Sequence, residues 1–486
     1  MPTNIPSLTS LSDSRLGDDS LALPILFAGP PTDDEPDSDR SLNFIESTIL
    51  GGSDVIDDTT PDSPVLEPTP PRTTPGGSPS RTLIMVGGAW QFPETEDPYG
   101  VSIYLDILKR AGGVKNAKIG IFTTASSSGQ RARENGRLYE QDFEDLYDLY
   151  LKDRFPNATI DVEWIPYHID NYKRKQDDRD LLKQIRSRNA FIFGGGDQSL
   201  ITEAFFNEDS ETGARTKTRP FQVFRRRFNQ GAIVAGTSAG TTSQVRSPMI
   251  TEGESYEALT EEPISLVGSP PFVRELHYNP LGGLGLFNYG LLDTHFSERG
   301  RQGRIIRLSS EVDVPRSYGV DENTALIVTD VGTSDVNMRV LGEGGVFISD
   351  LSNATVDDGE DWGITGVNTT YLTEGDVYDP LTQQARFRGK TALTGTEATT
   401  PSTDNVFSWK DPDTGDWTDP RAFTDTAIDL FRSQSSLGTG LSFESSPVQY
   451  VVNMRKADAA QGYIGQDSQG AETVSFDNLI VDILPT

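Results

Sequence analysis

Short apolar runs alternate with helical patterns over the part of the chain that begins at Arg81. The runs are typical of buried strands, and they lie at residues 82–86, 117–124, 160–165, 190–193 and 233–237. Helical spacing separates them, at residues 103–110, 138–155, 179–188, from about 199, and at 221–228. One face of the helix at 138–155 is expected to hold Phe143, Leu146, Leu149 and Tyr150. The alternation predicts an α/β fold, with a mostly parallel sheet covered by helices on both faces.

Glycine-rich turns follow three of the predicted strands, at residues 87–88, 194–196 and 236–240. The carboxyl ends of parallel strands meet at one edge of a sheet, and binding sites of α/β proteins form in the loops at that edge. The sequence therefore predicts a functional site there, built around these three turns.

From Gly319 onward the pattern changes to short β-like runs, found at residues 325–328, 338–341 and 346–349. Residues 398–403 have the composition of a linker or a long loop, and a helical pattern at 425–432 and an apolar strand at 479–484 follow them. We divide the chain into residues 1–80, 81–385 and 386–486. The last part is expected to be β-rich, either as a small unit of its own or as an extension of the main domain.

Residues 1–80 differ in composition from the rest of the chain. They contain 14 Asp or Glu, three Arg and no Lys, and they end in clusters of proline. So polar and proline-rich a segment cannot bury a core, and we expect it to be largely disordered.

The whole chain is strongly acidic, with 42 Lys and Arg against 73 Asp and Glu and a formal net charge of −31. This charge repels nucleic acids and anionic membrane surfaces, so neither is expected as a partner. The chain has no cysteine, which excludes disulfides, thiolate nucleophiles and cysteine zinc sites. No metal ion or cofactor is expected. No signal peptide or membrane-spanning run is visible, which favours the cytoplasm and leaves a non-classical export route open.

The turn Gly236-Thr-Ser238-Ala-Gly240 contains the first chemical candidate. Gly-x-Ser-x-Gly directly after a strand is typical of a nucleophile elbow, which lifts a serine hydroxyl above the edge of the sheet. Glycines flank the serine because the tight turn leaves little room for a Cβ atom. A serine nucleophile also needs a base, and histidine is the usual base near neutral pH.

The chain has three histidines, and one of them suits this role. His168 fits a surface loop, and His277 fits a structural or substrate-lining position. His295 ends an apolar run and precedes three arginines whose guanidinium groups suit substrate carboxylates, namely Arg299, Arg301 and Arg304. A third group should orient the imidazole, and two carboxylates before the strand at 325–328 are open candidates, Asp321 and Glu322.

Six short segments stand out when the chain is considered as a whole. They are Val86-Gly-Gly-Ala89, Phe122-Thr-Thr-Ala-Ser126, Gly195-Gly-Asp-Gln198, Gly236-Thr-Ser-Ala-Gly240, Asp293-x-His-Phe-x-x-Arg-x-Arg-x-x-Arg304 and Gly319-x-Asp-Glu-Asn-Thr-Ala-Leu326. Taken in this order, over residues 82–385, they resemble cyanophycinase, in the serine peptidase family that also contains the aspartyl dipeptidase called peptidase E.

The resemblance implies a flavodoxin-like α/β fold, with Ser238 as the nucleophile, His295 as general base and then acid, and Glu322 as the group that orients the imidazole. The oxyanion hole is expected at the backbone of Ala239, Gly196 and Asp197. Substrate binding is implied for Gln198, Asp293, Thr294, Arg299, Arg301 and Arg304. The implied substrate is cyanophycin, a polyaspartate with arginine joined to each side-chain carboxylate, and the implied product is the β-aspartyl-arginine dipeptide, released from a chain end.

Two positions depart from the family pattern. Thr294 stands where the family usually has glutamine, and Trp90 stands where an acidic residue is common. A related serine exopeptidase that cleaves short aspartyl peptides is therefore the first alternative. A glutamine amidotransferase normally uses a cysteine, and a non-catalytic binding protein of the same fold predicts a lost triad residue, which is not seen. The family also suggests a homodimer.

Overall fold

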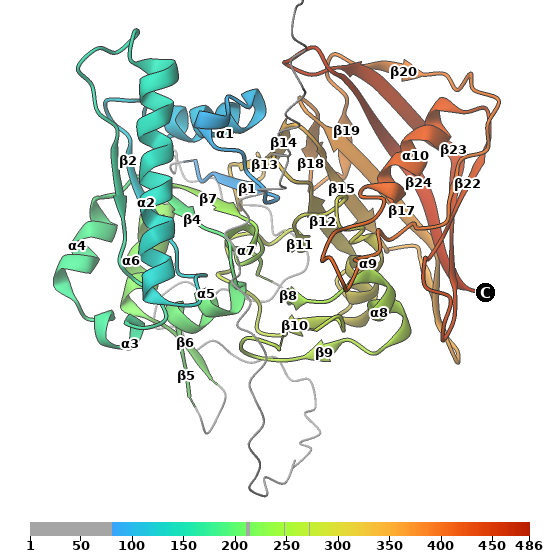
Figure 1. Ribbon diagram of the computed structural model, residues 1–486, viewed down its shortest axis with the longest axis horizontal. Helices are drawn as coiled ribbons and strands as arrows, with labels where there is room; N and C mark the ends of the chain where they lie inside the picture. The colour runs from blue at the N-terminus through green and yellow to red at the C-terminus, as the bar shows by residue number, and fades with distance from the viewer. Residues whose placement is uncertain (1–79, 210–213, 247, 272) are drawn as a thin grey trace, which may run out of the picture.

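The computed structural model describes residues 80–209, 214–246, 248–271 and 273–486. Apart from Ser80, the acidic segment at 1–80 lies outside these ranges. Figure 1 shows two neighbouring parts, one built of helices around a sheet and one rich in strands that holds the C-terminus. None of the helices in the described ranges combines the length and the apolar character of a membrane-spanning segment.

The α/β part is built on a nine-stranded mixed sheet with the order β19-β18-β14-β13-β1-β7-β4-β2-β3. Its parallel core consists of β1 (Leu83–Val86), β7 (Ile233–Thr237), β4 (Ala190–Phe193), β2 (Lys118–Phe122) and β3 (Asp161–Trp164). Its antiparallel strands are β13 (Thr324–Thr329), β14 (Asn337–Gly342), β18 (Val377–Asp379) and β19 (Gln384–Arg386).

The prediction of a mostly parallel sheet is therefore only partly correct, because β1 is the last parallel strand on one side. A short turn at residues 330–336 joins β13 to β14, and so short a connection reverses the chain direction. Within this sheet, the helical crossovers that parallel strands require occur only in the segment from β1 to β7. The pattern of strands and helices that indicated a parallel sheet comes from that segment.

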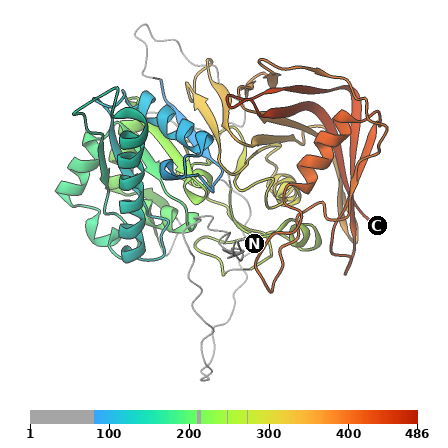
Figure 2. The same ribbon diagram turned by 45° about the horizontal axis from the view of Figure 1, so that its top comes forward.

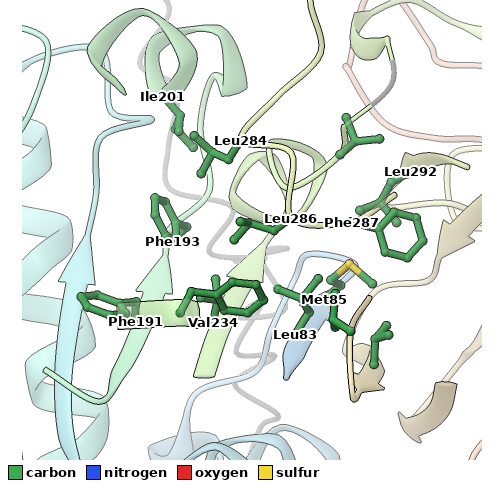
Figure 3. Packing of buried hydrophobic residues seen from close by; sticks show 14 of the residues in the cluster. Leu83, Met85, Phe191, Phe193, Ile201, Val234, Leu284, Leu286, Phe287 and Leu292 are labelled. Atoms are coloured by element: carbon green, nitrogen blue, oxygen red, sulfur yellow. The ribbon is translucent and has the colours of Figure 1, made fainter. Parts of the chain in front are cut away.

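Helices cover both faces of the parallel core. Successive side chains of a strand point to opposite faces, so Leu83 and Met85 pack in one core while Ile84 and Val86 pack in another. Figure 3 shows the first core, with Leu83, Met85, Phe191, Phe193, Val234 and Ile201. This face is covered by α4 (Arg179–Ser187), α5 (Gln198–Phe205) and α6 (Arg219–Asn229). The other face is covered by α1 (Pro98–Arg110), α2 (Gly129–Leu146) and the π-helical turn η2 (Tyr147–Leu151).

Helix α2 differs from its prediction at both ends. It begins at Gly129, nine residues before the predicted start. Its first turns are polar, so the apolar pattern did not indicate them. The π-helical turn η2 follows it and changes the angular spacing of the side chains. Phe143 and Leu146 are buried as expected, whereas Leu149 and Tyr150 are 53% and 40% exposed. The four residues that the pattern placed on one face therefore differ in burial.

The β-rich part is built on a ten-stranded sheet, in which β16 and β20 pair outside the main order β11-β12-β15-β17-β24-β23-β22-β21. In chain order its strands are β11 (Leu291–Asp293), β12 (Arg316–Val320), β15 (Gly345–Asp350), β16 (Thr355–Asp358), β17 (Trp362–Thr373), β20 (Thr391–Leu393), β21 (Ser402–Thr403), β22 (Leu437–Leu441), β23 (Tyr450–Gln466) and β24 (Glu472–Pro485). A separate hydrophobic core joins it to α8 (Ser255–Thr260), α9 (Gln302–Glu311) and α10 (Ala422–Arg432).

Residues 386–486 join the preceding part of the chain through this sheet. Strand β17 pairs with β24 and β24 pairs with β23, so strands from both sides of residue 385 lie in one sheet. The predicted strand at 479–484 is part of β24, which is 14 residues long. The segment predicted as a linker at 398–403 contains β21, which pairs with β22.

Eight further elements of the described ranges are short. They are η1 (Pro93–Thr95), α3 (Tyr172–Lys175), β5 (Phe206–Glu208), β6 (Arg215–Lys217), α7 (Ala239–Thr242), β8 (Met249–Glu252), β9 (Ile264–Ser265) and β10 (His277–Asn279). The two parts lie side by side in Figures 1 and 2, and α7 and β11 lie close together where they meet.

Candidate active site

Ser238 lies at the end of β7, in the sharp turn that leads into α7. Its φ of 51° and ψ of −121° are strained for a residue with a side chain. The flanking glycines permit the turn, since a Cβ atom at Gly236 would overlap the Gly240 carbonyl. A Cβ atom at Gly240 would overlap the Phe193 carbonyl. The segment therefore has the geometry of a nucleophile elbow.

His295 lies between Ser238 and Glu322. Its Nε2 atom is 2.8 Å from Ser238 Oγ, and its Nδ1 atom is 2.6 Å from Glu322 Oε1. The turn at Gly87 and Gly88 holds the His295 backbone in place, because the His295 backbone N–H donates to the Gly87 carbonyl at 2.6 Å. A Cβ atom at Gly88 would overlap the imidazole, so this approach requires glycine.

The neighbouring carboxylate, Asp321, is engaged elsewhere. Its Oδ1 atom accepts from the Ser297 N–H at 3.0 Å, and its Oδ2 atom accepts from the Tyr371 hydroxyl at 2.6 Å. Of the two carboxylates that the sequence left open, the fold brings Glu322 to the imidazole.

Burial and nearby charges set the protonation of this pair. Burial, followed by the positive charge of Arg299, lowers the pKa of His295 to about 4, and the hydrogen bond to Glu322 offsets only part of this shift. Burial raises the pKa of Glu322, but the His295 hydrogen bond and the nearby arginines outweigh it and lower the pKa overall. At neutral pH the imidazole is therefore neutral beside a carboxylate, and a neutral imidazole can accept the proton of Ser238.

The backbone groups predicted for the oxyanion hole are not equally available. In the described part of the chain, the N–H groups of Ala239 and Gly196 donate no hydrogen bond. The Asp197 N–H donates to the Ala125 carbonyl at 2.9 Å, so in this structure it is not available to an oxyanion. The Asp197 carboxylate instead caps α5 by accepting from the Ser199 N–H at 2.7 Å.

Arg304 and Asp293 form a buried ion pair at the edge of the site. Arg304 Nη2 lies 2.6 Å from Asp293 Oδ1, and Arg304 Nε lies 2.8 Å from Asp293 Oδ2. Arg304 also donates to the Gly253 carbonyl. Both carboxylate oxygens of Asp293 are therefore engaged by one guanidinium, so this pair supports the wall of the site rather than leaving Asp293 free for a substrate.

Arg299 and Arg301 bring positive charge to the surroundings of His295 and Glu322. Arg299 Nη2 is 4.0 Å from Glu322 Oε1. Arg301 Nη1 donates to the Thr294 carbonyl at 2.7 Å, and its buried Nε has no partner among the described residues. Burial, followed by the charge of Arg304, lowers the pKa of Arg301 to about 9, so it is still a cation at neutral pH. The two positive charges suit a bound carboxylate.

Gln198 and Thr294 also lie at the site, but their polar groups are partly engaged. The Gln198 amide donates to the carbonyls of Ile250 at 2.8 Å and Thr251 at 3.1 Å. Thr294 Oγ1 lies 3.5 Å from Thr242 Oγ1. Both residues line the cavity described next.

A cavity of about 200 Å³ lies beside Ser238. Apart from Glu322 and Asp197, every residue predicted for the site lines it. The sequence did not indicate a largely aromatic set of lining residues, which consists of Phe92, Tyr104, Leu138 and Tyr139. Trp90 belongs to the same set, and the sequence had marked it only as a departure from the family pattern. Nor did the sequence indicate a charged set, which consists of Glu252, Glu254 and Lys410, with Trp417 beside them.

Lys410 and Trp417 come from the C-terminal part of the chain. A β-bridge pairs them, and the Lys410 Nζ atom lies 5.5 Å from the centre of the Trp417 ring. The Arg299 guanidinium lies 6.0 Å from the centre of the same ring. No motif in the sequence marks these two residues, and only their place in the fold brings them to the site.

The other two histidines lie elsewhere. His168 Nε2 is 2.6 Å from the Asn171 amide nitrogen, and its ring stacks on Trp164. His277 lies in β10, where its Nδ1 atom is 2.9 Å from the Glu275 carbonyl. Within the described ranges, no group of three or more His, Asp or Glu side chains is suited to a metal ion.

Comparison with known proteins relates the sequence to cyanophycinases. No protein-family model matches the chain. The cyanophycinases of Synechococcus elongatus and Thermosynechococcus vestitus are each 27% identical to it over 335 residues, which cover 67% of this chain and 88% of each relative. The cyanophycinase of a Nostoc species is 26% identical over 189 residues, 38% of this chain and 54% of the relative.

Among solved structures, the chain is similar to a peptidase from an acI-B1 actinobacterium, with a TM-score of 0.40 and 17% sequence identity. That match covers 62% of this chain and 96% of the other. On the sequence similarity, which spans two thirds of its length, the chain is a distant homologue of the cyanophycinases.

Proposed function

We propose that this protein is a serine exopeptidase that releases β-aspartyl-arginine dipeptides from the ends of cyanophycin chains. The observation that carries the proposal is the position of His295, within hydrogen-bond distance of both Ser238 Oγ and Glu322. The homology to cyanophycinases supports both the peptidase class and the polymer.

In the proposed first step, Ser238 Oγ attacks the carbonyl carbon of the scissile amide while His295 Nε2 takes its proton. Glu322 stabilises the imidazolium through its contact with Nδ1. The N–H groups of Ala239 and Gly196 are the proposed donors to the oxyanion. His295 then gives the proton to the leaving amine, the C–N bond breaks, and an acyl-enzyme is left on Ser238.

In the second step, water cleaves the acyl-enzyme. His295 Nε2 takes a proton from the water as its oxygen attacks the ester carbon, and it returns this proton to Ser238 Oγ as the ester bond breaks. The acyl group leaves as a free carboxylate and the serine is regenerated. Because the same histidine acts in both steps, its replacement abolishes acylation and deacylation together.

The charges of the cavity support a substrate that bears a carboxylate next to the scissile amide. Arg301 lines the cavity as a cation, and Arg299 lies beside Glu322. Each unit of cyanophycin has such a carboxylate, on its arginine. The arginine guanidinium of the unit would lie against the aromatic residues, where Trp90 stacks on Tyr104 with ring centres 4.0 Å apart.

A short aspartyl peptide is the second candidate substrate. Lys410 adds a cation to the cavity beside Arg299 and Arg301, which favours an acidic peptide with more than one carboxylate. The cavity of about 200 Å³ also suits a small substrate. In this case the chain would cleave acidic dipeptides and leave cyanophycin intact.

We also propose the flavodoxin-like class for the parallel half of the main sheet. Counted from β2, the neighbouring strands β3, β2, β4 and β7 are all parallel and have the order 2-1-3-4 of that class, with β1 added in parallel beside β7. The site then lies at the carboxyl ends of β4 and β7, next to the point where the strand order reverses.

Incubation with insoluble cyanophycin, at low and at high salt, tests the proposal. We expect β-aspartyl-arginine, identified by mass, to accumulate with the wild type and not with Ser238→Ala. Cleavage of short aspartyl peptides without release from the polymer would favour the second candidate. Release by Ser238→Ala at the wild-type rate would exclude this serine as the nucleophile.

A further inference from the structure

Arg421 ties the catalytic turns to the C-terminal part of the chain. It directly precedes α10, and its backbone N–H donates to the Ser297 carbonyl at 2.9 Å. Its Nη1 atom lies 2.6 Å from Glu298 Oε1 and 3.0 Å from Asp321 Oδ2. Ser297 and Glu298 follow the base in the chain, and Asp321 precedes the carboxylate that orients it. The Arg421 residue therefore contacts both the turn that follows His295 and the turn that contains Glu322.

Further hydrogen bonds link these two turns directly. Glu298 Oε2 accepts from the backbone N–H of Glu322 at 3.1 Å. Asp321 Oδ1 accepts from the Ser297 N–H at 3.0 Å. The Tyr371 hydroxyl, from β17, donates to Asp321 Oδ2 at 2.6 Å and accepts from the arginine Nη2 at 2.9 Å. The network thus fixes where the base and its orienting carboxylate lie relative to each other.

Four carboxylates crowd into this network. Glu298, Asp321 and Glu322 belong to the two turns, and Asp425 of α10 lies 3.8 Å from Arg421 Nε. Burial, followed by the negative charge of Asp321, raises the pKa of Glu298 to about 8. The Arg421 cation acts against this shift, and it contacts Glu298 and Asp321 together. Without it the contacts that hold the two turns together are expected to weaken.

We propose that Arg421 is a positioning residue that holds the His295 turn against the Glu322 turn. Residues 386–486 are then a component of the catalytic apparatus rather than an accessory to it. Arg421 does not line the cavity, so it acts through the residues it holds. The inference rests on the proposed function in one respect, since it takes Ser238, His295 and Glu322 as the reacting set.

The test compares Arg421→Gln and Arg421→Lys with the wild type. Arg432→Gln is the matched control, because Arg432 ends the helix that Arg421 precedes and pairs at the surface with Glu472 and Asp429. The first readout is the second-order rate of Ser238 modification by a small fluorophosphonate. The second is the downfield proton resonance of the hydrogen bond between His295 and its carboxylate. Where the polymer is cleaved, kcat and KM are measured as well.

We expect Arg421→Gln to slow the modification of Ser238 by about 10- to 100-fold, the loss typical of a displaced catalytic group. Its downfield resonance is expected to shift or broaden, and kcat is expected to fall while KM is unchanged. Arg421→Lys is expected to lose about 10-fold, because lysine keeps the charge but lacks the fork that spans two carboxylates. Arg432→Gln is expected to match the wild type in every readout.

A folded Arg421→Gln protein with the wild-type rate and resonance would overturn the proposal. If that variant does not fold, Arg421→Lys decides the matter, and a wild-type rate in it would overturn the proposal equally. Failure of the proposed function has a different signature, since wild-type Ser238 would then not react at all. The resonance tests Arg421 even in that case.

Discussion

Replacement of Arg299 by glutamine is expected to move the acid limb of the pH–rate profile, where the rate falls at low pH, to higher pH. His295 must be neutral to accept the proton of Ser238, so the rate falls as the pH drops through the pKa of the imidazole. Burial and Arg299 hold that pKa at about 4. Removal of the cation makes the imidazolium less unfavourable, so the pKa rises and the rate begins to fall at a higher pH.

The magnitude follows from the geometry. Arg299 Nη2 is 4.0 Å from Glu322 Oε1, which is 2.6 Å from His295 Nδ1. The arginine and the imidazole are therefore at most about 6.6 Å apart, where two unit charges interact by about 2.5 kcal/mol at an effective dielectric constant of about 20. This energy corresponds to about two pKa units. Because the Arg299 side chain is 26% exposed, water screens part of it, and we expect a shift of about one to two units.

The assay is the rate of Ser238 modification by a fluorophosphonate, followed across the acid limb. This reagent does not depend on the substrate contacts of Arg299, so the shift reports on the base alone. Arg432→Gln provides the control for loss of a positive charge far from the site. An acid limb that stays in place, or moves to lower pH, would refute the electrostatic account of His295.

Three further changes test other parts of the site. Gly88→Ala is expected to slow modification of Ser238 by about 100-fold, because the new Cβ atom meets the imidazole, and a wild-type rate would contradict this packing. Asp293→Asn leaves Arg304 buried without its carboxylate, so the free energy of unfolding measured with urea should fall by about 3–5 kcal/mol, and no change would show that the pair is not buried. Lys410→Met is expected to raise KM for acidic substrates several-fold without slowing the modification of Ser238, and an unchanged KM would remove Lys410 from the binding site.

The reactive part of the site could be predicted from the sequence because its geometry is local. The glycines around Ser238 dictate a tight turn, and parallel strands bring their carboxyl ends to one edge. The choice of His295 needed only the small number of histidines. The residues alone left Asp321 and Glu322 open, because both lie in the same turn. The family resemblance implied Glu322, and in the fold the hydrogen bonds of the two carboxylates separate them.

The rest depends on long-range pairing that no short motif records. Lys410, Trp417 and Arg421 reach the site because β24 pairs with β17, and no spacing in the sequence indicates that partnership. Asp197 fits the predicted loop, yet its N–H is used by a carbonyl that only the folded turn brings close. The mixed sheet has a similar cause, since its hairpins follow the half of the chain in which strands and helices alternate.

The central claim is that Ser238 is a nucleophile activated by His295. Peptide mapping after reaction with a fluorophosphonate tests it most directly. We expect a single adduct on Ser238 in the wild type, and at least a 1,000-fold slower reaction in His295→Ala, roughly the loss seen when a triad base is removed. An adduct on another residue, or an equal rate in His295→Ala, would contradict the claim.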